Sequence, residues 1–112
     1  MESRFKAYVV WLITKGRAEE ALEELSKHYD VSLPSIKVGL PKGHSSKALG
    51  CYSAESETIS IRSSDVMRDP SVIIHEFYHH LRMDPEKKHR GTERKARDFS
   101  HGFIEAYRSQ TT

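Results

Sequence analysis

The chain has 112 residues, of which 37% are hydrophobic and 30% are charged, and its formal net charge is +2. A chain of this length buries one modest core and is too short for two, so we expect a single domain over residues 1–112. The weak positive charge does not by itself indicate a nucleic-acid-binding protein. Cys51 is the single cysteine, which excludes an intrachain disulfide and a cysteine-rich zinc cluster and fits a reducing compartment, the cytoplasm.

The first quarter of the chain predicts two helices. Apolar residues recur at intervals of three and four over residues 3–14, and Gly16 then breaks or kinks the helix. The same period continues to about His28, with a run of glutamates on the outer face. The apolar stretch Ala7–Ile13 is too short to span a bilayer and no cleavage site follows it, so we expect a core helix and no transmembrane segment.

The period changes after residue 34, which predicts a small sheet. Residues 36–38 form a short strand candidate, and residues 39–46, rich in glycine and proline, form a loop. Residues 48–53 and 58–62 predict a hairpin, because Ile59 and Ile61 alternate with polar neighbours. We therefore expect an α+β fold, with N-terminal helices, a mostly antiparallel three-stranded sheet and two further helices after it.

The stretch Val72–Leu81 contains His75, Glu76 and His79 in the spacing His-Glu-x-x-His. Residues four apart share one face of a helix, so both imidazoles can reach one metal ion while Glu76 projects beside it. Imidazole nitrogen is a common zinc ligand, and a carboxylate next to the first histidine can take a proton from water and pass it to a leaving amine. The spacing therefore predicts a hydrolytic zinc site.

The flanks of this motif indicate that it lies within a helix. Asp69 followed by Pro70 is typical of an N-cap and a first helical turn, and Asp84-Pro85 predicts a stop, giving a helix of about 13 residues. Met83–Gly91 is a charged segment, and Thr92 is a plausible N-cap for a last helix. That helix carries an apolar stripe, which consists of Ala96, Phe99, Phe103, Ile104 and Tyr107.

A catalytic zinc site uses three protein ligands and leaves the fourth position for water. The chain offers Glu93, His89, Asp98 and His101 as the third ligand. We favour Glu93, because it lies in the first turn of a rigid helix and the small Ala96 one turn later lets two helices approach closely.

The sequence His75-Glu-Phe-Tyr-His79 followed by Glu93-Arg-Lys-Ala96 resembles the gluzincin pattern, especially the ImmA/IrrE-like peptidases and the very small minigluzincins. The segment Ala48–Tyr52 leading to Ile59-Ser-Ile61 is similar to the hairpin before their active-site helix, so the resemblance spans about residues 36–107. It implies a zinc-dependent endopeptidase with one zinc per chain on positions 75, 79 and 93 and with position 76 as the general base. It also implies an extended peptide substrate held along residues 48–53 or 58–62.

Other functions remain open from the sequence. Small relatives of this kind can be latent, with a terminal segment such as Met1–Lys6 or Arg108–Thr112 across the cleft. A closed site that adds His89 to the three ligands would bind zinc structurally and act through protein or nucleic-acid partners, but Glu76 favours an enzyme. The cations of residues 87–97 are interrupted by acids, so this pattern does not favour nucleic-acid binding. Both a monomer and a homodimer are compatible with the size, and other divalent ions can occupy such a ligand set.

Supporting residues are less clearly indicated. An oxyanion donor could come from Tyr52, His89, His101 or Tyr107, although the two tyrosines fit core or rim positions better. Asp65 and Asp98 are candidate partners for the metal-binding imidazoles. His80 points about 100° away from His79 around the helix, so we expect it to miss the metal and to be solvated or bonded to a carboxylate.

Overall fold

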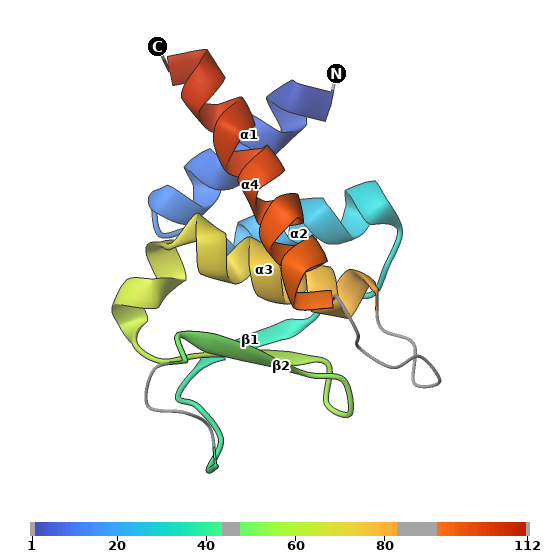
Figure 1. The fold of residues 1–112 in the computed structure, drawn as a ribbon, viewed down its shortest axis with the longest axis vertical. Helices are drawn as coiled ribbons and strands as arrows, with labels where there is room; N and C mark the ends of the chain where they lie inside the picture. Colours follow the sequence, from blue (N-terminus) through green and yellow to red (C-terminus); the bar gives the residue numbers. More distant parts are fainter. Residues whose placement is uncertain (1, 44–47, 83–91, 112) are drawn as a thin grey trace.

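The computed structural model describes residues 2–43, 48–82 and 92–111 and has the predicted α+β architecture (Figure 1). In chain order its elements are α1 (Glu2–Thr14), α2 (Ala18–Tyr29), β1 (Ser35–Val38), β2 (Gly50–Ser53), β3 (Thr58–Ile61), the 3₁₀ helix η1 (Ser64–Arg68), α3 (Pro70–Leu81) and α4 (Thr92–Thr111). The predicted break between the first two helices is confirmed, since Gly16 adopts a φ of 79°, which favours glycine. None of the described helices has both the length and the apolar character that a membrane span requires.

The helices lie on one side of the sheet (Figure 1). Helix α3 lies next to the sheet and contacts β2, and α4 packs across α3 and continues along α1. Both ends of the chain lie at the end of the molecule that is remote from the sheet (Figure 1). The motif helix therefore lies between the sheet and the remaining helices.

The three strands form a mixed sheet in the order β1-β3-β2. Strand β2 is antiparallel to β3, as the predicted hairpin requires, whereas β1 is parallel to β3, with Ile36 opposite Ile59. The expectation of a mostly antiparallel sheet is therefore wrong for β1. The reason is that β3 lies between β1 and β2, so the chain reverses twice after β1 and regains its direction in β3.

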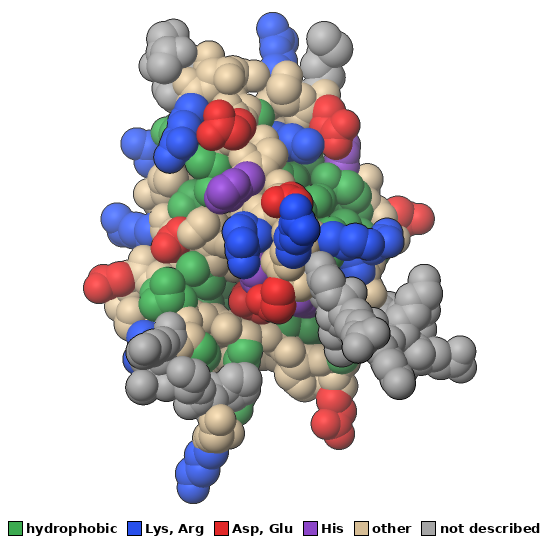
Figure 2. Space-filling model, in the orientation of Figure 1, with side chains coloured by type: hydrophobic (Ala, Val, Ile, Leu, Met, Phe, Trp, Pro, Cys, Tyr) green, Lys and Arg blue, Asp and Glu red, His purple; other side chains and the backbone are tan. Residues whose placement is uncertain are grey.

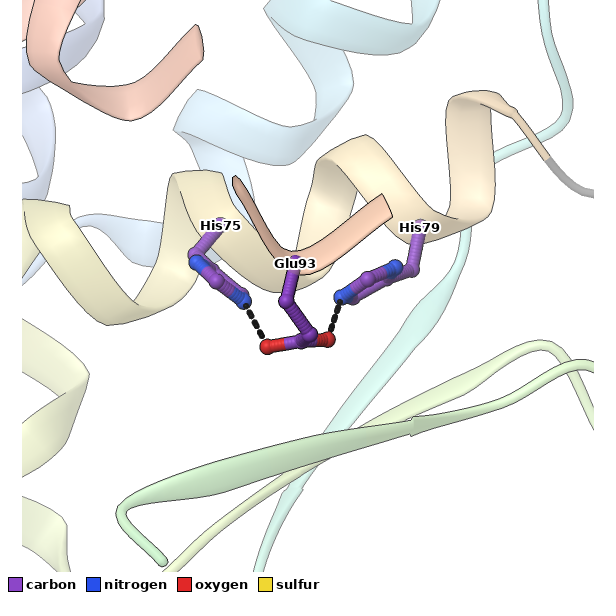
Figure 3. Close-up of side chains that lie close together, drawn as sticks. All are labelled: His75, His79 and Glu93. Carbon is purple, nitrogen blue, oxygen red and sulfur yellow. Dashed lines mark hydrogen bonds and ion pairs between the residues drawn. The ribbon is translucent and has the colours of Figure 1, made fainter. Parts of the chain in front are cut away.

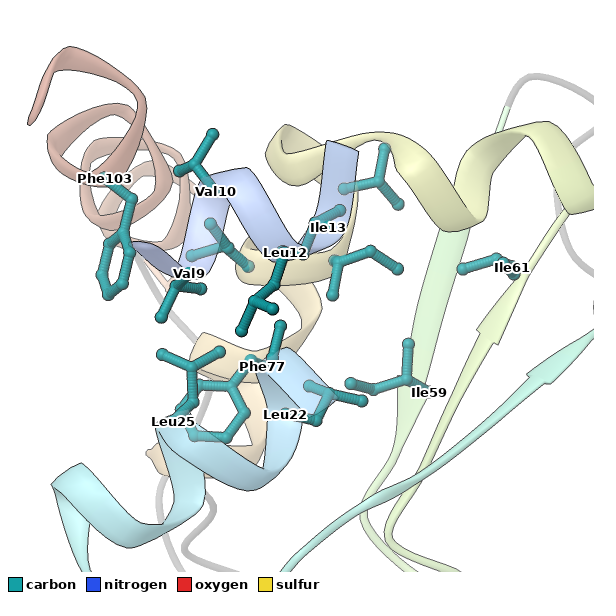
Figure 4. Close-up of a cluster of buried hydrophobic side chains, with 14 of the residues drawn as sticks. Val9, Val10, Leu12, Ile13, Leu22, Leu25, Ile59, Ile61, Phe77 and Phe103 are labelled. Carbon is teal, nitrogen blue, oxygen red and sulfur yellow. The ribbon is translucent and has the colours of Figure 1, made fainter. Parts of the chain in front are cut away.

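The core forms where all four helices meet β3 (Figure 4). Its largest fully buried side chains are Val9, Leu12, Ile13, Leu22, Leu25, Ile59, Ile61, Ile73, Ile74, Phe77 and Phe103. Burial of such side chains contributes about 1.5–3 kcal/mol each relative to exposure. Because α3 contributes three of them, the packing fixes the orientation of this helix. Polar side chains on its opposite face can therefore form a site of defined geometry.

Candidate metal centre

Helix α3 begins at the predicted residues. The Oδ1 atom of Asp69 accepts a hydrogen bond from the backbone N–H of Ser71 at 3.0 Å, and Pro70 occupies the first turn. The N-cap satisfies a backbone donor that the helix itself cannot pair. The helix ends at Leu81, slightly before the predicted stop, and Asp84-Pro85 lies outside the described residues.

Helix α4 crosses α3 closely because a small residue lies at the contact. Ala96 is completely buried, as predicted, and the rings of Tyr78 and Phe99 pack with their centroids 5.1 Å apart. Glu93 lies one turn before Ala96, so this crossing carries its carboxylate over the exposed side of α3. Ala96 thus helps to determine where the third candidate ligand lies.

The side chains of His75, His79 and Glu93 converge (Figure 3). The Nε2 atom of His75 lies 3.1 Å from Glu93 Oε2, and the Nε2 atom of His79 lies 2.7 Å from Glu93 Oε1. The two imidazole centroids are 5.1 Å apart. One ligand atom from each of the three residues lies within 4.8 Å of the others, and no other such group occurs among the described residues.

These three residues fit a tetrahedral divalent ion such as zinc. Bonds of about 2.0–2.1 Å place the ligand atoms of such an ion roughly 3.4 Å apart, so only small shifts are needed to seat it. The Glu93 side chain is 74% exposed and can move, whereas the histidines are mostly buried. Each Nε2 atom donates its N–H to the Glu93 carboxylate. Binding of a metal ion would require both Nε2 protons to leave, so that the Nε2 lone pairs could coordinate the ion.

Glu76 lies beside this group in a more buried position. It is 8% exposed, and its Cγ atom would lie 3.4 Å from a Cβ atom added to Gly50 in β2. Burial, together with the negative charge of Glu93, raises the pKa of Glu76 to about 7. A carboxyl group in such a position exchanges a proton near neutral pH.

His80 differs from the expectation. It is 3% exposed, and its Nε2 atom lies 2.7 Å from the carbonyl oxygen of Ser32 while its Nδ1 atom lies 2.7 Å from the hydroxyl of Tyr52. A carbonyl only accepts, so Nε2–H donates to Ser32, and with that proton on Nε2 the Nδ1 atom offers a lone pair to the Tyr52 hydroxyl. The prediction that His80 is solvated or bonded to a carboxylate is wrong, because its hydrogen-bond partners come from distant segments of the chain. The prediction that His80 lies outside the group of candidate metal ligands is confirmed.

The remaining candidates do not join the ligand group. His101, Asp98 and Asp65 are exposed, and Tyr107 packs against the core cluster. The hydroxyl of Tyr52 is engaged by His80, and burial raises the pKa of Tyr52 to about 12, so it stays protonated. His89 lies outside the described residues, and so do the closed four-ligand site and the oxyanion role that were predicted for it.

The surface around the centre is rich in charge. Lys and Arg side chains gather over the first half of α4 next to acidic side chains (Figure 2), and Arg94, Lys95 and Arg97 are exposed there. The predicted terminal covers do not reach the centre in their described parts, since residues 2–6 and 108–111 are helical and lie at the end remote from the sheet (Figure 1). No family model, no curated protein and no solved structure matches this chain.

Proposed function

We propose that this protein is a zinc-dependent endopeptidase. The observation that carries the proposal is the convergence of His75 and His79 with Glu93 from a second helix, with Glu76 immediately beside them. Two histidines and a glutamate leave room for water in a tetrahedral site, which is the arrangement of catalytic rather than structural zinc. The resemblance of the motif to gluzincins points to the same activity.

His75, His79 and Glu93 would hold one zinc ion per chain. When bound, zinc lowers the pKa of water towards neutrality and polarises a carbonyl group. The helices fix the two imidazoles, since both rings are mostly buried, while the exposed carboxylate of Glu93 completes the set. Most of the arrangement is therefore preorganised, which reduces the cost of binding the ion.

Glu76 acts as the general base in this proposal. Its carboxylate accepts a proton from the attacking water and returns it to the nitrogen of the leaving amine. The Glu76 side chain lies between α3 and Gly50 of β2, which shield its carboxylate from bulk solvent on one side. The close packing also restricts the positions that the carboxylate can adopt. A positioned acid-base group of this kind contributes about 10²–10⁴ in rate.

The substrate in this proposal is an extended segment of a protein or peptide. Strand β2 lies at one edge of the described sheet and contacts α3, so an extended chain that adds to this edge passes close to Glu76. The high exposure of Glu93 leaves the centre open to a large substrate. Pairing through backbone groups gives affinity that depends little on the sequence of the substrate.

Two paired measurements test this function. Elemental analysis of purified protein should give one zinc per wild-type chain and a clear loss in Glu93→Ala, with Glu105→Ala as a matched control further along α4. Cleavage of fluorescent casein should be lost in Glu76→Gln and after chelation, and zinc should restore the chelated enzyme. Stoichiometric zinc without cleavage would instead support a structural or latent zinc protein, and absence of zinc binding would refute the proposal.

A further inference from the structure

Strand β2 is attached to α3 at two points on either side of Glu76. Val72, Glu76 and His80 are four residues apart and share one face of α3. At one end, Gly50 approaches so closely that an added Cβ would lie 2.9 Å from Val72 Cγ1. At the other end, the Tyr52 hydroxyl lies 2.7 Å from His80 Nδ1. The two contacts together set the distance between β2 and Glu76.

The register of β2 identifies which of its backbone groups point away from β3. The N–H of Arg62 donates to the carbonyl of Leu49 at 2.9 Å, and Gly50 lies opposite Ile61. Hydrogen-bonded pairs alternate along antiparallel strands, so the backbone groups of Gly50 and Tyr52 point away from β3. These are the same two residues that contact α3. The outer edge of β2 is therefore positioned directly by its contacts with the motif helix.

His80 is itself held in place. Its ring is buried, and the N–H of Nε2 is bonded to Ser32 in the connection between α2 and β1. The ring therefore links α3 to two segments that are far away in the sequence. A buried ring with both nitrogens bonded has one orientation, and that orientation determines where the Tyr52 hydroxyl lies.

We propose that His80 is a positioning residue of the enzyme, which through Tyr52 holds the outer edge of β2 in register with Glu76. The inference rests on the proposed function, because it concerns how a peptide on that edge is aligned for cleavage. Loss of the bond between Tyr52 and His80 leaves the edge able to bind a peptide but shifts the scissile carbonyl relative to Glu76. Small displacements of this kind reduce turnover more than affinity.

Three variants separate the two hydrogen bonds of His80. Tyr52→Phe removes the hydroxyl. His80→Gln keeps an amide donor at the Nε2 position for Ser32 but loses the acceptor for Tyr52, whereas His80→Asn keeps an acceptor at the Nδ1 position and loses the donor to Ser32. Steady-state kinetics on a quenched fluorescent peptide, chosen from the casein cleavage products, should show kcat reduced about tenfold or more in Tyr52→Phe and His80→Gln, with KM nearly unchanged. His80→Asn keeps the acceptor for Tyr52 and should therefore lose less of the wild-type kcat than His80→Gln does.

The controls separate positioning from folding and from the activity itself. Tyr29→Phe removes the hydroxyl of another partly buried tyrosine that packs on Phe77, and it should leave kcat unchanged. Zinc content and melting temperature are measured for every variant, and the kinetics are measured well below the lowest melting temperature. Equal kcat values in Tyr52→Phe, His80→Gln and Tyr29→Phe, in an active wild type, would overturn the positioning role alone. A zinc-loaded wild type that cleaves nothing would overturn the proposed function and the positioning role with it.

Discussion

Replacement of Glu76 by glutamine should make the metal-free protein more stable at neutral pH. Burial holds the pKa of Glu76 near 7, compared with its ordinary value of 4.5. Above pH 4.5 the unfolded chain releases this proton while the folded chain keeps it, so the wild type loses stability as pH rises towards 7. A difference of about 2.5 pKa units corresponds to about 3 kcal/mol at 1.36 kcal/mol per unit. The glutamine variant does not ionise and does not incur this loss.

The assay is urea unfolding of chelator-treated protein at pH 5 and pH 8. The stability advantage of Glu76→Gln should grow by about 2–3 kcal/mol between the two conditions, because most of the linkage window lies between them. Glu23→Gln, an exposed position on α2, is the matched control and should show no such growth. An advantage of Glu76→Gln that is the same at both pH values would refute the reasoning, because it would show that the folded protein does not disfavour the charged carboxylate. Metal is removed because a bound cation favours the charged form.

Zinc at a hundred times its dissociation constant should stabilise the wild type by about 2.7 kcal/mol, or roughly 10 °C in melting temperature, and differential scanning fluorimetry should show this shift disappearing in Glu93→Ala but not in Glu105→Ala. Equal shifts in both variants would exclude Glu93 as a ligand. Gly50→Ala should cost about 1–3 kcal/mol by urea unfolding, because its Cβ would meet Val72 Cγ1 at 2.9 Å, and the same substitution should cost less in a Val72→Ala background. A lone Gly50→Ala variant as stable as wild type would contradict the close approach of β2. Asp69→Ala should cost about 1 kcal/mol by the same measurement through loss of the N-cap, and an unchanged midpoint would show that the cap is dispensable.

The sequence was informative where the deciding interactions are local. The start of α3 follows from Asp69 and Pro70, and the placement of His75 and His79 follows from helical periodicity. Glu93 could be selected because its helix has a small residue one turn later, and that residue is buried at the crossing. Such signals lie within a few residues of one another, so one sequence is enough to recognise them.

Interactions between distant segments could not be predicted in this way. The parallel pairing of β1 with β3 depends on which strand lies between the other two, and no local pattern encodes that order. The partners of His80 lie 28 and 48 residues earlier in the chain. A signal was present, since Val72, Glu76 and His80 are spaced by four and indicate one common face of α3, but only the fold shows that this face contacts β2.

Helix α4 has a further consequence for how such a centre can vary. Glu93 lies near its beginning, while Phe103, about 15 Å further along the axis, is completely buried in the core where α4 packs along α1. Glu93 is thus positioned by a helix that is anchored at its middle. Changes in how α4 packs along α1 should therefore move Glu93 relative to His75 and His79, although they lie far from these residues.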